Sequence, residues 1–243
     1  MSTNIMSLAA QDVWQESSRQ QHQLGQIGET PDGKMFRYAK MGEAITIGRV
    51  TQAAAIDTCH VKQAVDAIAA IGDKTITFTA NAVETAANSM AEGFAIISYG
   101  TGIGQTLKIK WNPTYTSTQA GAVCYLEDPL IVALDTTSKL DFAVNPWNGV
   151  LMAHSLVTTA TGGAIRSFTS GYYGWLQTKG IFGAFADAGV AAAGYSFAFD
   201  ASEDGSVDVT ANTLTQVLLG NTIQATEDAY AHPVYLRIDG ASY

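Results

Sequence analysis

Alternating apolar and polar positions along the chain predict many short β-strands. In residues 34–40, Phe36 and Tyr38 fall on one face of an extended segment and the residues between them fall on the other. A repeat of two residues is the repeat of a strand, not of a helix. Similar runs follow about every ten residues with turn-forming residues between them, which is typical of an all-β sandwich or barrel. These runs are 44–50, 75–80, 94–99, 107–111, 122–126, 130–134 and 140–144.

A second series of strands is predicted in the C-terminal part of the chain. The segment NPWNG, residues 145–149, interrupts the alternation and is expected to join two modules. The strands expected after it are 149–153, 171–178, 181–186, 195–199, 207–210, 215–220 and 234–238. We therefore predict an all-β fold of two small β-barrel or sandwich modules, one covering 27–148 and the other 149–243.

Two segments depart from the strand pattern. Residues 1–26 are polar and rich in glutamine, with Trp14 as an isolated large apolar residue. They predict an extended N-terminal arm that docks on something else instead of packing in the core. Residues 59–71 have apolar positions at helical spacing, followed by Gly72 as a possible cap. This segment is the best candidate among the one or two short helices, at most, that we expect.

The segment GYYGW, residues 171–175, places bulky side chains on both faces of a strand. Tyr173 and Trp175 share one face, and Tyr172 and Leu176 share the other. Such a strand is buried on both sides, or is buried on one side and covered by a partner. Burial in the core remains one interpretation, and a partner interface is the other, because Tyr and Trp favour interfaces. The candidate interface residues are Trp14, Phe36, Arg37, Tyr38, Tyr172, Tyr173 and Trp175.

The composition narrows the classes of function. Charged residues make up 14% of the 243 positions, against the usual share of about 25%, so long amphipathic helices with charged outer faces are not expected. The net charge is −9, and residues 180–243 hold eight acids and one base. A surface of this sign repels nucleic-acid phosphate, and we expect no nucleic-acid partner.

Membrane insertion and secretion are not expected either. No apolar run approaches the length of about 18 residues that would span a membrane. The first residues lack a basic segment followed by an apolar stretch, so no signal peptide is predicted. Cys59 and Cys124 are not spaced as a metal or redox motif, which agrees with synthesis in a cytoplasm and reduced thiols.

A glycine-rich segment, SYGTGIGQTLKIKW at 98–111, follows a predicted strand as a phosphate-binding loop would. A dinucleotide fingerprint requires a third glycine where Gln105 stands, and a helix behind it. Leu107, Ile109 and Trp111 instead alternate with two lysines, which predicts a strand with these three residues on one face. We interpret the three glycines as a hairpin loop that needs positive φ angles, and expect no nucleotide or other cofactor.

Three other kinds of site have candidate residues in the sequence: a calcium loop, a metal site and a pair of catalytic carboxylates. Residues 200–208, DASEDGSVD, resemble a calcium loop in five positions, but Ala211 stands where the bidentate Glu belongs, and the sequence leaves calcium binding open. The histidines are scattered and no metal site is expected. The neighbouring carboxylates Glu127 and Asp128 would need a cleft to act in acid–base catalysis, so an enzyme, such as a glycan hydrolase, ranks last among the hypotheses.

Several stretches taken together resemble a known group of proteins. LGQIGETPDGKMFRYAKMG near the start is followed by MAEGFAIISYGTGIGQTLKIKWNP, LEDPLIVAL, NPWNGV and SGYYGWLQTKG. In this order they are similar to proteins encoded beside the capsid genes of tailed bacteriophages. The C-terminal part, from GYYGWLQT through VLLGNTI to VYLRI, resembles the small β modules of phage capsid decoration (head cement) proteins.

The resemblance implies a structural virion protein without enzymatic activity. Such proteins bind the major capsid protein on the outside of the expanded head, commonly as homotrimers, and stabilise it by bridging capsomers. The expected location is the outer surface of the capsid, after synthesis in the cytoplasm of the bacterial host. The alternative is a tail- or fibre-associated protein that binds a host-surface glycan, with Trp111, Trp147 or Trp175 stacked on sugar rings.

Overall fold

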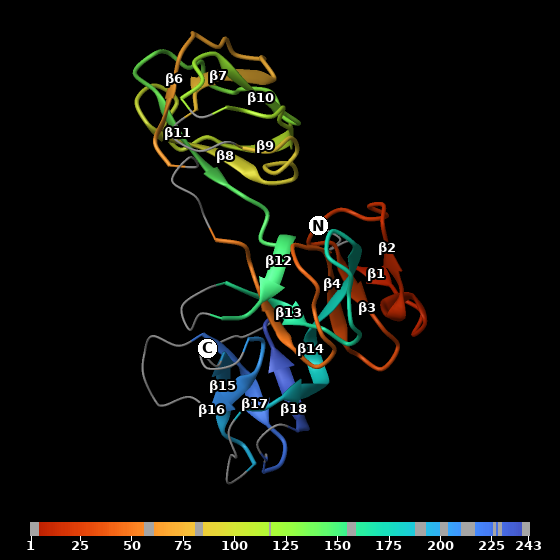
Figure 1. Ribbon diagram of the computed structural model, residues 1–243. Coiled ribbons are helices and arrows are strands. Elements are labelled where there is room, and N and C mark those ends of the chain that lie inside the picture. The colour runs from red at the N-terminus through yellow and green to blue at the C-terminus, as the bar shows by residue number, and fades with distance from the viewer. Residues whose placement is uncertain are drawn as a thin grey trace. The chain divides into compact units, whose positions relative to one another are not determined.

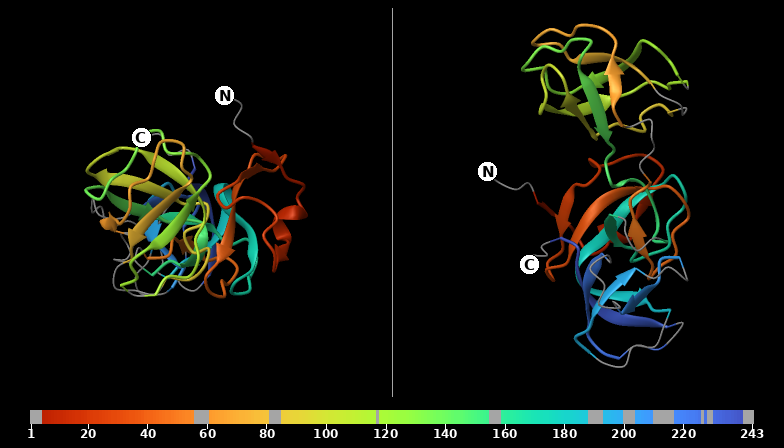
Figure 2. Two further views of the ribbon diagram at one scale, coloured as in Figure 1. Left: turned by 90° about the horizontal axis from the view of Figure 1, so that it is seen from above. Right: turned by 90° about the vertical axis from the view of Figure 1, so that its left-hand side faces the viewer.

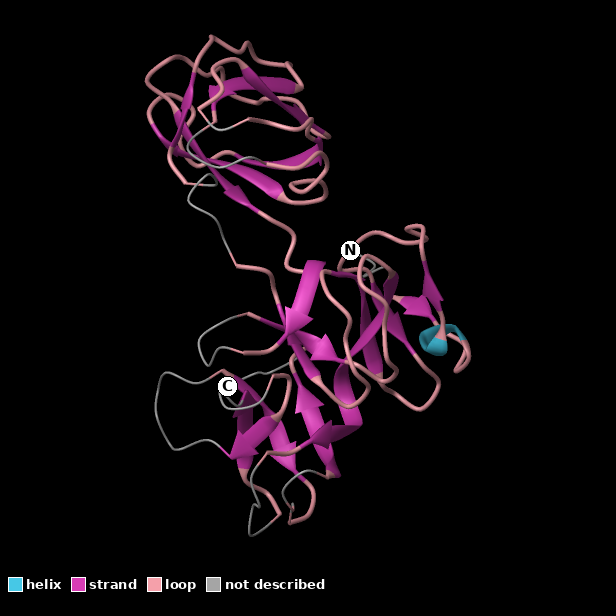
Figure 3. Ribbon diagram, viewed as in Figure 1, coloured by secondary structure: helices cyan, strands magenta, loops and turns pink. Residues whose placement is uncertain are grey.

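The structure is a computed structural model in which the chain forms two compact units, each with its own core. Unit 1 consists of Met1–Ala54 and Pro146–Tyr243, and unit 2 of Ala55–Asn145. The predicted all-β class with barrel-like modules is confirmed, and the described residues contain one short helix, η1 (Asp12–Trp14) (Figure 3). The described residues are 5–55, 61–80, 85–116, 118–154, 159–187, 193–199, 204–209, 217–225, 227 and 230–239.

Unit 2 is a closed antiparallel barrel in which the six strands pair in the order β10-β7-β6-β11-β8-β9 (Figures 1 and 2). Along each strand, residues that point into the barrel alternate with residues that point outward, and the inner set includes Phe78, Ile97, Ile109 and Phe142. Full closure removes the free edges that an open sheet would expose. The strands are β6 (Gln63–Val65), β7 (Thr75–Thr79), β8 (Phe94–Tyr99), β9 (Thr106–Trp111), β10 (Ala122–Leu126) and β11 (Lys139–Ala143).

Unit 1 is built on one large sheet that joins both ends of the chain. Its strand order is β1-β3-β4-β12-β5-β13-β14-β18-β17-β15-β16, with β2 paired to β14 and a further pairing between β4 and β14. The strands are β1 (Met6–Ser7), β2 (Glu16–Ser17), β3 (Ile27–Glu29), β4 (Met35–Met41), β5 (Val50–Gln52), β12 (Asn148–Met152), β13 (Ala160–Gly163), β14 (Tyr173–Phe185), β15 (Ser196–Phe199), β16 (Val207–Val209), β17 (Leu218–Thr222) and β18 (Ala231–Arg237).

The two units do not coincide with the predicted domains 27–148 and 149–243. Residues 27–54 belong with the C-terminal part of the chain, because β4 pairs with β14 and with β12. The barrel is thus an insertion into unit 1, and NPWNG is one of the two connections between them. Local alternation identifies strands but not their partners, so the boundary could not be placed from the pattern alone.

The N-terminal segment packs against unit 1 and is not an extended arm. β1 pairs with β3, β2 pairs with β14, and Leu8 and Val13 are buried in a core cluster. Burying these two side chains offsets part of the entropy cost of ordering a polar segment, and the backbone hydrogen bonds of β1 and β2 offset more of it. Trp14, predicted as the isolated anchor of the arm, is exposed.

Three further predictions of local structure are wrong. Within 59–71, the described residues form β6 and an isolated bridge at Ala69 in place of a helix. Residues 130–134 form a loop, with Leu130 and Leu134 buried and Ile131 exposed, and 44–50 holds a bridge at Ile45 in place of a strand. The segments 171–178 and 181–186 do form strands as predicted, and they join into one continuous strand, β14.

The glycine loop is a hairpin, as predicted. It joins the antiparallel strands β8 and β9, and Gly100, Gly102 and Gly104 all have positive φ, at 78°, 80° and 91°. At Gly100 an added Cβ would also lie 2.4 Å from the carbonyl oxygen of Thr137. These residues are therefore required by the turn of the backbone itself.

Candidate functional site

Three of the six predicted interface aromatics belong to the core of unit 1. Phe36, Tyr38 and Trp175 are 2–3% exposed. The Tyr38 and Trp175 rings lie 5.2 Å apart in an edge-to-face arrangement, and the N-terminal segment covers them with Leu8 and Val13. These three side chains therefore stabilise the sheet and do not offer a surface to a partner. Tyr172 and Tyr173 are half-buried. Among the seven predicted residues, Trp14 is the most exposed, at 54%.

Arg37 also has a structural role. Its guanidinium donates two hydrogen bonds from Nε and Nη2 to the carboxylate of Asp239, at 2.8 Å each, and one from Nη1 to the carbonyl oxygen of Gly25. It lies 4.5 Å from the ring centre of Trp147. A planar guanidinium suits this combination of a forked ion pair and ring stacking. Arg37 thus ties β4 to the end of the described chain and is committed to contacts within unit 1.

The direction of the barrel strands brings three loops to one end. Strands β6, β8 and β10 run one way and β7, β9 and β11 run the other. The loops that follow β6, β8 and β10 therefore lie together, opposite the end at which the chain enters and leaves the barrel (Figure 1). We term this end the barrel tip and define it as residues 66–74, 100–105 and 127–138.

The barrel tip exposes an unusual amount of aliphatic surface. Each of the three loops contributes, and hydrogen bonds such as that from the Gly72 amide to the Leu130 carbonyl oxygen hold the loops against one another. Exposed apolar side chains that gather in this way mark an interaction surface, whereas single ones do not. The exposed residues are Ile68 at 78%, Ile71 at 69%, Ile103 at 66%, Ile131 at 71% and Val132 at 44%.

Acidic residues accompany this aliphatic surface. Hydrogen bonds from the hydroxyls of Thr101 and Thr137 lower the pKa of Asp135, a carboxyl that is ionised at neutral pH even at its ordinary pKa. A partner for the tip would thus need an apolar surface that tolerates negative charge. In the three loops, the acids near this surface are Asp73, Glu127, Asp128 and Asp135, and the single base is Lys74. The carboxylate of Asp66 instead accepts hydrogen bonds from Thr79 and Gly121, toward the opposite end of the barrel.

Gln105 holds two of the tip loops together, and it is the residue that breaks the dinucleotide fingerprint. Its Oε1 accepts hydrogen bonds from the amides of Ile131 and Val132, at 3.0 Å each. Its Nε2 donates to the carbonyl oxygens of Val132, at 2.9 Å, and Gly102, at 3.3 Å. The side chain is buried, and its hydrogen-bonding capacity is used in full. It therefore fixes the backbone from which Ile131 and Val132 project.

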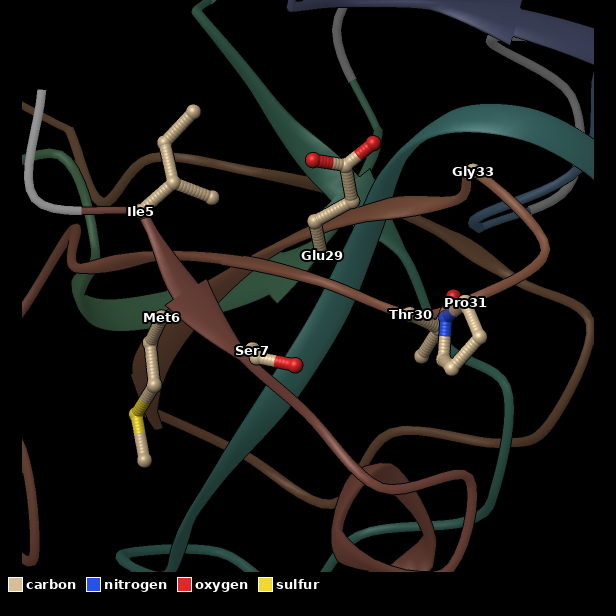
Figure 4. Close-up of a pocket in the computed structure, with 7 residues that line it drawn as sticks. All are labelled: Ile5, Met6, Ser7, Glu29, Thr30, Pro31 and Gly33. Carbon is tan, nitrogen blue, oxygen red and sulfur yellow. The ribbon is translucent and has the colours of Figure 1, made fainter.

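A second exposed apolar region lies at the N-terminal edge of unit 1. β1 is the first strand in the sheet order, and Ile5 and Met6 are 40% and 36% exposed. An open hollow of about 370 Å³ adjoins them (Figure 4). We term Ile5 and Met6 the N-terminal edge. Figure 4 shows β1 and the turn that follows β3 on opposite sides of this hollow, which is lined by Ile5, Met6, Ser7, Glu29, Thr30, Pro31 and Gly33.

A third feature is an aromatic pair on the outside of the barrel. Leu107 and Ile109 point inward as predicted, but Trp111, expected on the same face, is 38% exposed. The register explains the difference: Leu126 pairs with Ile109, yet the preceding Tyr125 pairs with Trp111, so β9 contains one extra residue. This β-bulge turns Trp111 outward beside Tyr125. Their rings are stacked, with centres 4.1 Å apart and planes at 11°.

The other two tryptophans that were candidates for sugar stacking lie elsewhere. Trp175 is buried. Trp147 is partly buried, and its indole N–H donates a hydrogen bond to the carbonyl oxygen of Thr161. Of the three, Trp111 is the one with an exposed ring.

The remaining candidate residues are the possible calcium loop and the neighbouring carboxylates. Asp200 and Ser202 of the possible calcium loop lie outside the described residues, and within those residues no group of three or more His, Cys, Asp or Glu side chains is placed to hold a metal ion. Glu127 forms an ion pair with Lys108, at 3.4 Å. In the described part of the chain, no helix has the length and apolar character needed to cross a membrane.

Sequence reasoning missed the barrel tip because no local signal marks it. An aliphatic run such as LIVAL predicts a buried strand whether its side chains face a core or solvent.

The chain matches no family model, no curated protein and no solved structure.

Proposed function

We propose that this chain is a structural virion protein that binds the outside of a tailed-phage capsid and stabilises the expanded head by bridging capsomers. Its partners would be the major capsid protein and further copies of itself, as a homotrimer. Its place would be the outer capsid surface, where it would act by adhesion and without catalysis.

The arrangement of the segments that resemble proteins encoded beside phage capsid genes, and of the C-terminal segments that resemble decoration proteins, supports this proposal. The segment at 24–42 forms β3 and β4, and the segment at 170–180 begins β14. Although far apart in sequence, they pair directly, with Tyr38 opposite Trp175. β18 then pairs with β14, and β17 with β18. Part of the resemblance is therefore carried by one connected sheet, and two further segments that carry it, 90–113 and 126–134, lie in the inserted barrel.

The observation that carries the proposal is the exposed aliphatic surface of the barrel tip. A protein that bridges two subunits needs at least two contact surfaces, and we assign this role to one exposed apolar region on each unit, the barrel tip and the N-terminal edge. Apolar groups of this kind supply the buried centre of protein interfaces. When such contacts repeat over a shell, modest single affinities add up through avidity.

The test is binding of the purified chain to expanded heads that lack it. We expect co-sedimentation, and heads without the protein should release DNA at a lower temperature. Replacing Ile68→Ser and Ile131→Ser together should weaken binding about tenfold or more, because both exposed side chains lie at the tip. Ile47→Ser is the matched control, since Ile47 is 53% exposed but lies in unit 1, outside both contact surfaces.

Failure of the unchanged protein to bind such heads would refute the proposal. The tail- or fibre-associated alternative differs in where the chain sits on the virion. Electron microscopy with a label on this protein separates the two, because a label on the tail and absent from the head supports only the alternative.

A further inference from the structure

The outward face of strands β7 to β10 gathers aromatic and charged side chains on one patch of the barrel. Trp111 and Tyr125 stack there, and Thr75 lies opposite Tyr125 on the next strand. Lys108 lies opposite Phe94 and pairs with Glu127. Thr75, Phe94, Lys108 and Tyr125 alternate along their strands with residues that point into the barrel core. Trp111 is turned outward by the bulge, and Glu127 follows the end of β10. We term this set the outer aromatic face: Thr75, Phe94, Lys108, Trp111, Tyr125 and Glu127.

The position of Trp111 is set by a departure from regular pairing. A regular continuation of β9 would place it in the barrel with Leu107 and Ile109, where an indole ring would be shielded from water. The bulge at the end of β9 places it outside instead, where 38% of it is exposed. Bulges often re-aim a side chain at a functional surface. Phe94, on the neighbouring strand, is likewise 44% exposed.

We infer that the outer aromatic face binds a pyranose ring of a polysaccharide. One side of a pyranose presents C–H groups, which pack on an aromatic ring, and its rim presents hydroxyls, which need donors and acceptors. Trp111, stacked on Tyr125, provides a rigid ring for the C–H side. Lys108 and Glu127 provide a donor and an acceptor a short way along the strands, and Thr75 provides a hydroxyl.

The charge and shape of the face favour a sugar over other ligands that stack on aromatic rings. A nucleic acid would bring phosphates toward a chain of net charge −9. A protein partner of purely apolar character fits the barrel tip better, because there the exposed side chains are aliphatic and come from three loops. The outer aromatic face instead alternates rings with a charged pair, which suits a ligand that is both apolar and hydroxylated.

The experiment applies the full-length chain to an array of bacterial surface polysaccharides, including O-antigens, capsular polysaccharides and peptidoglycan fragments. The glycan retained is then titrated by tryptophan fluorescence and calorimetry. We expect at least one glycan to bind, and Trp111→Ala to weaken its binding about tenfold or more. Trp111→Phe keeps a ring at the position and should retain most of the affinity.

Trp14→Ala is the matched control, because Trp14 is an exposed tryptophan of unit 1, and it should bind the glycan as the parent does. Absence of binding to every glycan on the array would overturn the inference, as would equal affinity of Trp111→Ala and the parent. A folded Trp111→Phe protein that loses as much affinity as Trp111→Ala also contradicts stacking. The inference does not rest on capsid attachment: Trp111→Ala should still co-sediment with heads, so the two ideas fail independently.

Discussion

Replacing Gln105 tests how the barrel tip is held in place. The side chain makes four hydrogen bonds, and three of them reach Ile131 and Val132 in the neighbouring loop. At about 1 kcal/mol net for each bond, the three contribute about 3 kcal/mol. Ile131 and Val132 lie in an exposed loop, so their freed backbone groups regain bonds to water, and we expect Gln105→Ala to cost about 2 kcal/mol. For a unit of 91 residues (55–145), this lowers the melting temperature by roughly 10 °C.

Calorimetry measures the loss of stability, and amide hydrogen exchange locates it. In Gln105→Ala the amides of Ile131 and Val132 should exchange much faster, because their acceptor is gone. The amide of Leu134 is an internal control, since it donates to the Ala69 carbonyl oxygen and does not involve Gln105.

Gln105→Leu separates hydrogen bonding from packing, because it fills much the same space without a polar group. We expect it to be destabilised to a similar degree. A Gln105→Leu protein as stable as the parent would refute the reasoning, and so would continued protection of the Ile131 and Val132 amides in Gln105→Ala. Either result would mean that the tip loops are held by packing and not by this amide.

Three other outcomes follow from single sites. Burial raises the pKa of the Cys124 thiol to about 12, so at pH 8 alkylation mapped by mass spectrometry should spare it until a denaturant is added, and rapid native labelling would contradict its burial. Hydrogen bonds from Lys34 and, to a smaller extent, Thr30 lower the pKa of Asp32 to about 2. The stabilising contribution of these bonds is therefore fully present above the unfolded pKa near 4 and is lost as the pH falls through about 2. An NMR titration midpoint near 4 would disprove the lowered pKa. Arg37→Leu should destabilise unit 1 by about 2 kcal/mol in denaturant unfolding, because it leaves the Asp239 carboxylate without its forked partner, and an unchanged midpoint would show that the ion pair contributes nothing.

Much of the local structure could be predicted from the sequence. Alternation located the barrel strands at 75–79, 94–99 and 106–111 to within a residue or two, because the side chains of a strand point alternately to core and solvent. Because Gln105 breaks the dinucleotide fingerprint, the sequence predicted a hairpin and not a nucleotide-binding loop. This prediction is correct, since the glycines are needed for the turn itself.

Features that depend on pairing between distant segments could not be predicted. The run at 130–134 is as apolar as a strand, yet its Ile131 and Val132 face solvent because Gln105 binds their backbone. Trp111 follows the alternation of β9 and still points outward, because an extra residue shifts its register against β10.

By itself, the sequence determined that this protein is built of short strands and tight turns. Both are local properties, because the alternation of apolar and polar side chains and the positive φ angles of glycine depend only on residues close together in the chain. Only the tertiary structure decided that the segment around Tyr38 joins the sheet of Trp175, and which apolar side chains remain at the surface. The physical reason is that backbone hydrogen bonds between strands carry little sequence information, so partner and register are chosen by the packing of the whole chain.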